Sequence, residues 1–187
     1  MISENCKSNL KNLAGIINEV KKKNHKNEYG VLMLDIDYEG WNDILDMIDQ
    51  EDIYDSEPGF GYEKKPHCTA LFGFHKTASV SKIKELIKDK QSGPIELEIG
   101  NITHFETPDY DVVKFDVHSP EMHKINKLMR DNFSYTNDYP NYKPHMTVAY
   151  VKKGTGKKYD SKSKKIKMQS NKFIYSPSEG SKSYFTF

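Results

Sequence analysis

The chain has 187 residues, of which 36% are hydrophobic and 29% charged, and this composition is that of a folded protein and not of a disordered one. The length predicts one sizeable domain with a shared core. The formal net charge of +1 argues against a protein that binds long duplex nucleic acid by neutralising many phosphates. A small anionic ligand remains compatible with this charge.

Localisation and redox state follow from what the chain lacks. No apolar run approaches the roughly 20 residues of a membrane span, and the N-terminus has no apolar signal-peptide core. We therefore expect a cytoplasmic protein with no membrane partner, and nothing implies a protein partner. Cys6 and Cys68 are predicted to be free thiols, and neither indicates a metal cage. All the basic residues except Arg130 are lysines, so bidentate phosphate clamps are nearly absent.

The first elements in chain order are a helix and then a strand. Apolar residues at helical spacing predict a packing helix over 3–23, and residues 1–28 are interpreted as this helix and a linker ahead of one domain at 29–187. The short apolar run at 29–37 has the length of a strand, and the pattern at 41–48 is helical. A loop rich in Gly and Pro follows.

The middle of the chain repeats the order of strand and helix. Residues 67–74 predict a strand and 79–90 a helix. The segments 94–105 and 110–118 alternate apolar and polar residues around a turn, which predicts an antiparallel hairpin. A helix capped by Ser119 follows. These elements favour an α+β or mixed α/β fold with antiparallel pairing and outer helices.

One phrase occurs twice: KPHCTALF at 65–72 and KPHMTVAY at 143–150. A second accidental match of this kind is expected on the order of once in a few thousand chains of this composition. Because side chains on a strand alternate between faces, His67 and Thr69 share one face, and so do His145 and Thr147. By the same alternation we expect the closing aromatics of both phrases on the core side. No residue-level repeat is expected beyond the phrase.

The two phrases together supply two imidazoles and two hydroxyls. Imidazole titrates near neutral pH and serves as base or acid, so one histidine can take a proton while the other gives one. The threonines can donate to the non-bridging oxygens of a phosphate. This set suits phosphodiester cleavage without a metal or other cofactor. The remaining histidines have no partner phrase and are interpreted as structural or surface residues, and Trp41 as a core residue.

The paired His-x-Thr motifs resemble the two-histidine (2H) phosphoesterases. That resemblance implies a two-lobed, pseudo-symmetric α+β fold with antiparallel sheets around a central cleft and outer helices. The catalytic residues it implies are His67, Thr69, His145 and Thr147, with no metal. One histidine is the base and the other the acid, and the sequence leaves open which.

Within that superfamily, phrases such as YGVLMLDID and FIYSPSEGSKSYF resemble the viral anti-CBASS phosphodiesterases, which destroy cyclic di- and trinucleotide immune signals of the host. This resemblance implies cleavage of 3′-5′ bonds in the host-cell cytoplasm. It also implies substrate contacts by Tyr29, Glu179 and Phe185. For all three, plain packing or turn roles remain open.

Two alternatives stay open at this point. The first is an enzyme of RNA ends that opens 2′,3′-cyclic phosphates or handles 2′-5′ linkages. The second is a sponge that binds nucleotides without cleaving them, which the intact His and Thr pairs argue against, because binding alone needs no two titrating groups.

Overall fold

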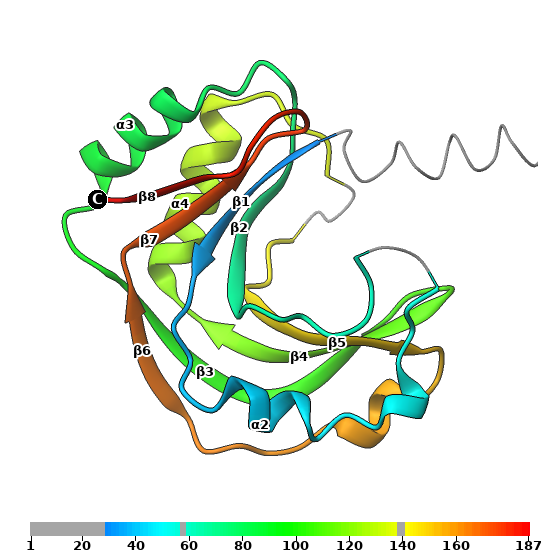
Figure 1. Ribbon diagram of the computed structural model, residues 1–187. Helices are drawn as coiled ribbons and strands as arrows, with labels where there is room; N and C mark the ends of the chain where they lie inside the picture. Colours follow the sequence, from blue (N-terminus) through cyan, green and yellow to red (C-terminus); the bar gives the residue numbers. More distant parts are fainter. Residues whose placement is uncertain (1–28, 57–58, 138–140) are drawn as a thin grey trace, which may run out of the picture.

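The computed structural model describes residues 29–56, 59–137 and 141–187, so the helix expected over 3–23 lies outside the described part. Two four-stranded antiparallel sheets face each other at an angle, with helices on their outer sides (Figure 1). The predicted α+β, two-lobed fold is confirmed. No helix within the described ranges is long and apolar enough to cross a membrane.

Each lobe contains one sheet. The first sheet has the strand order β2-β1-β7-β8 and the second has the order β5-β4-β3-β6. The strands of the first sheet are β1 (Gly30–Asp35), β2 (His67–Phe74), β7 (Lys172–Ser176) and β8 (Ser183–Thr186). The strands of the second are β3 (Ile95–Glu106), β4 (Tyr110–His118), β5 (His145–Lys152) and β6 (Ile166–Ser170).

Three α-helices lie in the described residues. They are α2 (Trp41–Leu45), α3 (Val80–Lys90) and α4 (Pro120–Asn132), with 3-10 turns η1 (Gln50–Asp52) and η2 (Gly156–Tyr159). Ser119 caps α4 as predicted, since its hydroxyl accepts the Met122 N–H at 3.2 Å and Pro120 opens the helix. The helix predicted over 41–48 is shorter than expected, because the chain tightens after Leu45 into bonds to the third residue back.

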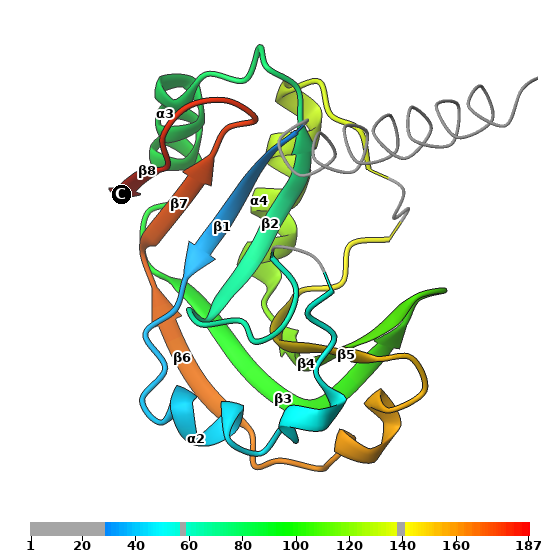
Figure 2. The same ribbon diagram turned by 45° about the vertical axis from the view of Figure 1, so that its right-hand side comes forward.

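The outer face of each sheet is covered partly by a helix that follows a strand of the other sheet (Figures 1 and 2). The helix α2 follows β1 but packs on the second sheet, where the Trp41 ring lies 6.3 Å from the Phe115 ring. The helix α4 follows β4 but packs on β2, where Asn126 Nδ2 donates to Ala70 O at 2.7 Å. One contiguous hydrophobic cluster therefore runs through both lobes. Trp41 is 5% exposed, which confirms its core position.

The free edges of β2 and β5 are covered in the same crossed way. The described residues 53–56 and 59–63, ahead of β2, pair with the edge of β5: Tyr54 N donates to Tyr150 O and Glu63 N donates to Val148 O. The segment after α4, which leads into β5, pairs with β2, and Thr136 N donates to Gly73 O at 2.9 Å. We call β2 and β5, which carry the His-x-Thr motifs, the motif strands. The edge of each motif strand is therefore covered by the segment that leads into the other motif strand.

The internal repeat extends beyond the repeated phrase. Residues 29–36 read YGVLMLDI and residues 110–117 read YDVVKFDV, and they form β1 and β4 with one residue before β1 and one after it. The register of β1 on β2 matches that of β4 on β5: Asp35 pairs with His67 as Asp116 pairs with His145. The prediction that no repeat extends beyond the phrase was wrong. The longer repeat is hard to detect in the sequence, because only the Tyr, Val and Asp positions are identical between the two segments.

Gly73 fixes the contact between β2 and the segment that leads into β5. Its φ is +102°, and a Cβ there would lie 1.8 Å from the carbonyl oxygen of Thr136. We predict that Gly73→Ala lowers the free energy of unfolding by at least about 2 kcal/mol in urea denaturation, since strain and a backbone clash add. Gly93→Ala is the matched control, because no atom lies within 4 Å of its added Cβ. Equal stability of the two variants would contradict this account of the crossed edges.

Candidate active site

Each motif strand contains one extra residue directly after its His-x-Thr segment. In β2 the register on β1 shifts between Thr69 and Leu71, and in β5 the register on β4 shifts between Thr147 and Ala149. The bulged residues are Ala70 and Val148. The carbonyl of each bulge is satisfied, by Asn126 Nδ2 at 2.7 Å and by the Glu63 N–H at 2.9 Å. A β-bulge reverses the alternation of side chains beyond it.

The bulges bring the closing aromatic of each phrase to the same face as the motif. Phe72 pairs with Val31, and Tyr150 with Val112, on the side of the sheet that carries the histidines. Phe72 is 45% exposed. The prediction that Phe72 and Tyr150 lie on the core side was wrong, because strict alternation was applied across a strand that contains a bulge. The repeated phrase thus specifies three inward positions: His, Thr and aromatic.

Both histidines are oriented by the same backbone contact. His67 Nδ1 lies 3.0 Å from the carbonyl oxygen of Lys65, and His145 Nδ1 lies 2.7 Å from that of Lys143. A carbonyl only accepts, so Nδ1 carries the proton and donates. In a neutral ring this leaves Nε2 as the acceptor, and in a protonated ring Nε2 becomes a donor. Each imidazole therefore presents the nitrogen that base or acid catalysis needs.

The two motif strands meet at a seam between the sheets. On the core side of β2 the Cys68 thiol interacts with the backbone of His145 and with the hydroxyl of Tyr142. Burial raises the pKa of this thiol to about 12, so it is a packing group and not a nucleophile. Tyr142 also donates to the Thr69 carbonyl at 2.8 Å. The structure thereby brings the two predicted His-Thr pairs together, and His67 contributes to the electrostatic environment of His145.

His145 lies in a charged and mostly buried setting. Burial is the main cause that lowers its pKa, and the positive charges of Lys114 and His67 lower it further, while its bond to the Lys143 carbonyl and the carboxylate of Asp116 act in the opposite direction. The ring also packs edge-on against Phe105, with the centroids 5.1 Å apart. A histidine with a lowered pKa is neutral at neutral pH and suits the role of base.

His67 lies in a different environment. Its side chain is 20% exposed, and Glu63 Oε1 lies 3.9 Å from its Nδ1. Asp35 on β1 is its cross-strand partner. Since the environment of His145 suits the base, His67 is left for the role of acid.

Aromatic groups flank the motifs in both lobes. In the first lobe the Tyr29 ring lies 6.3 Å from Phe72 and 5.9 Å from His75. In the second lobe Tyr150 lies 5.6 Å from Tyr110, the counterpart of Tyr29 in the repeat. The structure therefore places Tyr29, one of the expected substrate contacts, beside the inward aromatic of its lobe.

The other two expected substrate contacts are not brought to the motifs. Glu179 lies in the exposed turn between β7 and β8 and forms an ion pair with Lys76, just beyond the far end of β2. Phe185 pairs with Phe173 and stacks on it, with Lys84 of α3 over its ring, so it lies on the helix-covered face. The positions of Glu179 and Phe185 give no support to the substrate contacts expected of them. Tyr184 occupies the opposite face of β8 and is 61% exposed.

Several residues on the motif face were not anticipated. Lys114 is the cross-strand partner of Thr147 and is only 4% exposed. Its ammonium contacts Asp116 and Thr103 Oγ1, the latter at 2.6 Å, and lies 4.3 Å from the centroid of the Phe105 ring. In the sequence, Lys114 and Asp116 are the ordinary polar positions of an alternating strand. The sequence signal that could have identified Lys114 is the alignment of 110–117 with 29–36, in which Lys114 stands where the first segment has Met33.

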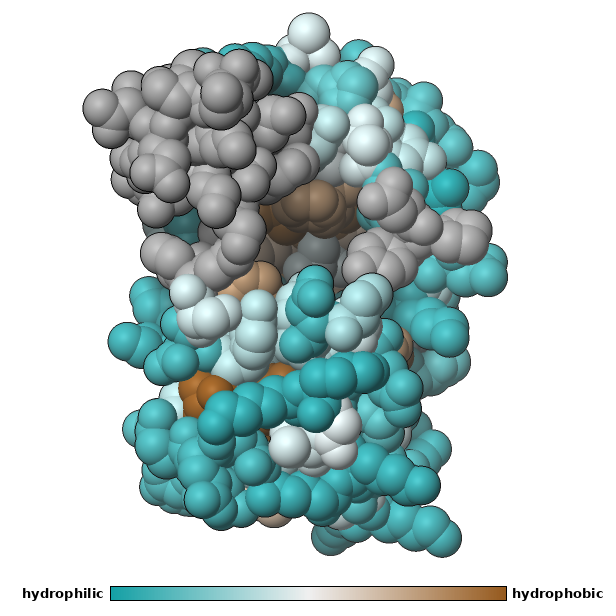
Figure 3. Space-filling model, turned by 90° about the vertical axis from the view of Figure 1, so that its right-hand side faces the viewer, coloured by the Kyte–Doolittle hydropathy of each residue, from teal (hydrophilic) through white to brown (hydrophobic). Residues whose placement is uncertain are grey.

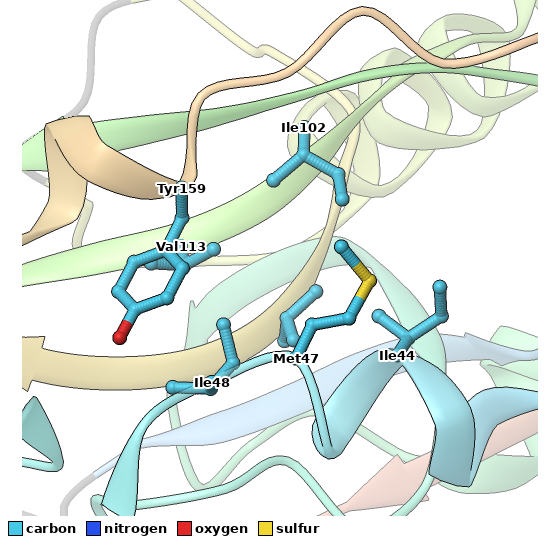
Figure 4. A pocket seen from close by; sticks show the side chains of 7 residues that line it. Ile44, Met47, Ile48, Ile102, Val113 and Tyr159 are labelled. Atoms are coloured by element: carbon cyan, nitrogen blue, oxygen red, sulfur yellow. The ribbon is translucent and has the colours of Figure 1, made fainter. Parts of the chain in front are cut away.

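The surface on the side where the two sheets part is hollowed (Figure 3). The recess exposes hydrophobic residues, while the surface below it is largely hydrophilic. A separate small cavity lies beneath α2, where only apolar side chains and Tyr159 line it (Figure 4). Its wall includes Val113, whose side chain faces away from the motif side of β4. This cavity is a gap in the packing, and the Tyr159 hydroxyl, the polar group of its lining side chains, is already bonded to Asp52.

Comparison with known proteins agrees with this geometry. The sequence model of the 2′-5′ RNA ligase superfamily, which comprises 2H phosphoesterases, matches residues 48–169. That is more than half of the chain, so the chain belongs to this superfamily, and the superfamily supports a metal-independent, phosphodiesterase-type activity. A search among curated proteins finds no match. Within the described ranges, no group of three His, Cys, Asp or Glu side chains is placed to hold a metal ion.

The environment of His145 gives a direct prediction. Because its pKa is lowered, we expect its ring to titrate below the ordinary value of 6.5. Histidine ring resonances followed by NMR between pH 4 and pH 8 measure this. The resonance that disappears in His145→Ala identifies the residue among the seven histidines of the chain. A titration at or above 6.5 would contradict the assignment of His145 as the neutral base.

Proposed function

We propose that this protein is a metal-independent phosphodiesterase that cleaves 3′-5′ bonds of cyclic di- and trinucleotides. The observation that carries the proposal is the pair of matched lobes, each of which directs a histidine, a threonine and an aromatic to one face. The His-Thr pairs supply acid-base groups and phosphate donors. The aromatics supply platforms for bases on both sides of the scissile phosphate.

The lowered pKa of His145 supports an order of steps in which His145 is the base. His145 Nε2 takes the proton of the ribose 2′-hydroxyl, and the 2′-oxygen attacks phosphorus. The bond from phosphorus to the 5′-oxygen breaks, and His67 Nε2 gives its proton to that oxygen. Thr69 and Thr147 donate to the non-bridging oxygens. The 2′,3′-cyclic phosphate that forms is opened by water with the two histidines in reversed roles.

The proposed substrate is small, for reasons of charge and reach. The net charge of +1 gives no long basic track for a polynucleotide. Phe72 lies about 10 Å along β2 from Thr69, so it is within reach of a base whose phosphate lies at the motif. The resemblance to viral anti-CBASS enzymes supplies the biological expectation, in which removal of cyclic nucleotide signals blocks a host defence.

A second candidate function follows from the superfamily. The superfamily is named for 2′-5′ RNA ligases, and cleavage of 2′-5′ linkages or opening of RNA 2′,3′-cyclic phosphates would use the same two histidines. The Tyr29–Phe72 and Tyr110–Tyr150 pairs serve a linear RNA end as well as a cyclic dinucleotide.

A product assay on mixed substrates tests the proposal. Purified protein is incubated at pH 7 with EDTA and cyclic dinucleotides, cyclic trinucleotides, 2′-5′ dinucleotides or an RNA ending in a cyclic phosphate. We expect cleavage of a cyclic oligonucleotide, reduced by about 10²- to 10⁴-fold in His67→Ala and in His145→Ala. Cleavage of RNA alone would select the second candidate. Binding without any product would select the sponge.

The aromatic platform gives a separate prediction about affinity. Stacking of a base on an aromatic ring contributes roughly 1–3 kcal/mol, so Phe72→Ala and Tyr29→Ala are each expected to raise Kd for the cleaved substrate about tenfold or more. The matched control is Tyr184→Ala, since Tyr184 is exposed but lies on β8, three strands away from β2. Affinities are measured by calorimetry in a His145→Ala background, which prevents turnover. Unchanged Kd in both site variants would rule out this platform.

A further inference from the structure

The two lobes differ at one position of the motif face. Thr69 pairs with Met33 across β1, whereas Thr147 pairs with Lys114 across β4. The neighbouring pairs are the same in both lobes, with an aspartate opposite the histidine and a valine opposite the aromatic. Lys114 therefore breaks the pseudo-symmetry of a site whose other inward positions correspond.

A lysine at this position requires compensation. Lys114 is 4% exposed, and an ammonium taken out of water is costly unless it is paired and hydrogen-bonded. Asp116 and Thr103 take two of its three donors, and the Phe105 ring lies under it. Among the described residues, the third donor has no partner. A methionine at this position, as in the first lobe, would need neither the ion pair nor the hydrogen bond.

The position of Lys114 relates it to both catalytic groups of its lobe. Residues paired across antiparallel strands have Cβ atoms about 4.5–5.5 Å apart, so the stem of Lys114 lies beside Thr147. The Phe105 ring contacts both the ring of His145 and the ammonium of Lys114. In a low-dielectric setting, the charge of the Lys114 ammonium acts strongly on the neighbouring imidazole of His145 and on a phosphate bound beside Thr147.

We propose that Lys114 assigns the two histidines their roles: as a permanent cation beside His145 and Thr147, it makes the second lobe the phosphate-binding, proton-accepting half of the site. This inference rests on the proposed function. Lys114 is a positioning residue, because it acts through the field at His145 and the phosphate and is nearly covered. In the first lobe Met33 stands at the corresponding position, so this cation has no counterpart beside Thr69.

The charged groups that act on His145 come from two neighbouring strands. From β4 come Lys114 and Asp116, from β2 comes His67, and its own strand entrance supplies only the carbonyl of Lys143. The face of β3 contributes Phe105 and the neutral hydroxyl of Thr103. Within the described residues, Lys114 is thus the lysine that acts on this imidazole.

The test replaces Lys114 with the residue of the other lobe. In Lys114→Met the ring resonance of His145 is expected to titrate at higher pH than in the wild type, because a positive charge beside it is removed and Asp116 is left unpaired. The Kd of adenosine 3′-monophosphate, measured by calorimetry, is expected to rise about tenfold, and kcat/KM for the cleaved substrate to fall at least about tenfold. Lys127→Met is the control. It removes the same charge from exposed Lys127, which pairs with Asp131 on α4.

The outcomes separate this inference from the proposed function. An unchanged His145 titration together with unchanged nucleotide affinity in Lys114→Met overturns it. If the wild type cleaves no substrate of the panel, the proposed function fails, while a shifted titration and a raised Kd still support Lys114. Should Lys114→Met fail to fold, Lys114→Met with Asp116→Asn removes both charges of the pair. A higher-pH titration and a raised Kd are expected there too, and wild-type values for both would overturn the inference.

Discussion

The single extra residue in each motif strand decides which side chains face the cleft. Without the bulges at Ala70 and Val148, strict alternation would turn Phe72 and Tyr150 away from the histidines and into the core. The bulges persist because their carbonyls are bonded, one by Asn126 from α4 and the other by the N–H of Glu63. A local irregularity in the strand is therefore held by residues that lie far away in the sequence.

We call β1 or β4, with the segment that follows it, an arm of the chain. In both cases the bonding residue belongs to the arm opposite the bulge, and these crossed contacts join the two lobes. The helix and loop that follow β1 cover the second sheet, and the helix and loop that follow β4 cover the first. Neither motif strand is complete without the other arm. A two-histidine site benefits from this construction, because the two imidazoles must be held in fixed relation although they belong to different sheets.

Much of the site was predictable from sequence, and its limits have a physical explanation. The His67-Thr69 and His145-Thr147 pairs share faces because alternation holds over two residues, and the repeated phrase marked both. The positions of Phe72 and Tyr150 could not be derived from alternation, since a bulge depends on tertiary partners. The spacing itself, with two residues between Thr and aromatic in both copies, was the available indication. Lys114 was missed because a lysine in an alternating strand is ordinarily a solvated residue.

The leaving group distinguishes a proton-accepting His145 from a proton-donating His67. In a substrate whose bridging 5′-oxygen is replaced by sulfur, the leaving thiolate needs no protonation, because thiols have a pKa of about 8.5. The account predicts that this substitution restores most of the activity lost in His67→Ala but leaves His145→Ala inactive. Rescue of His145→Ala with no rescue of His67→Ala would contradict the assignment of the two histidines.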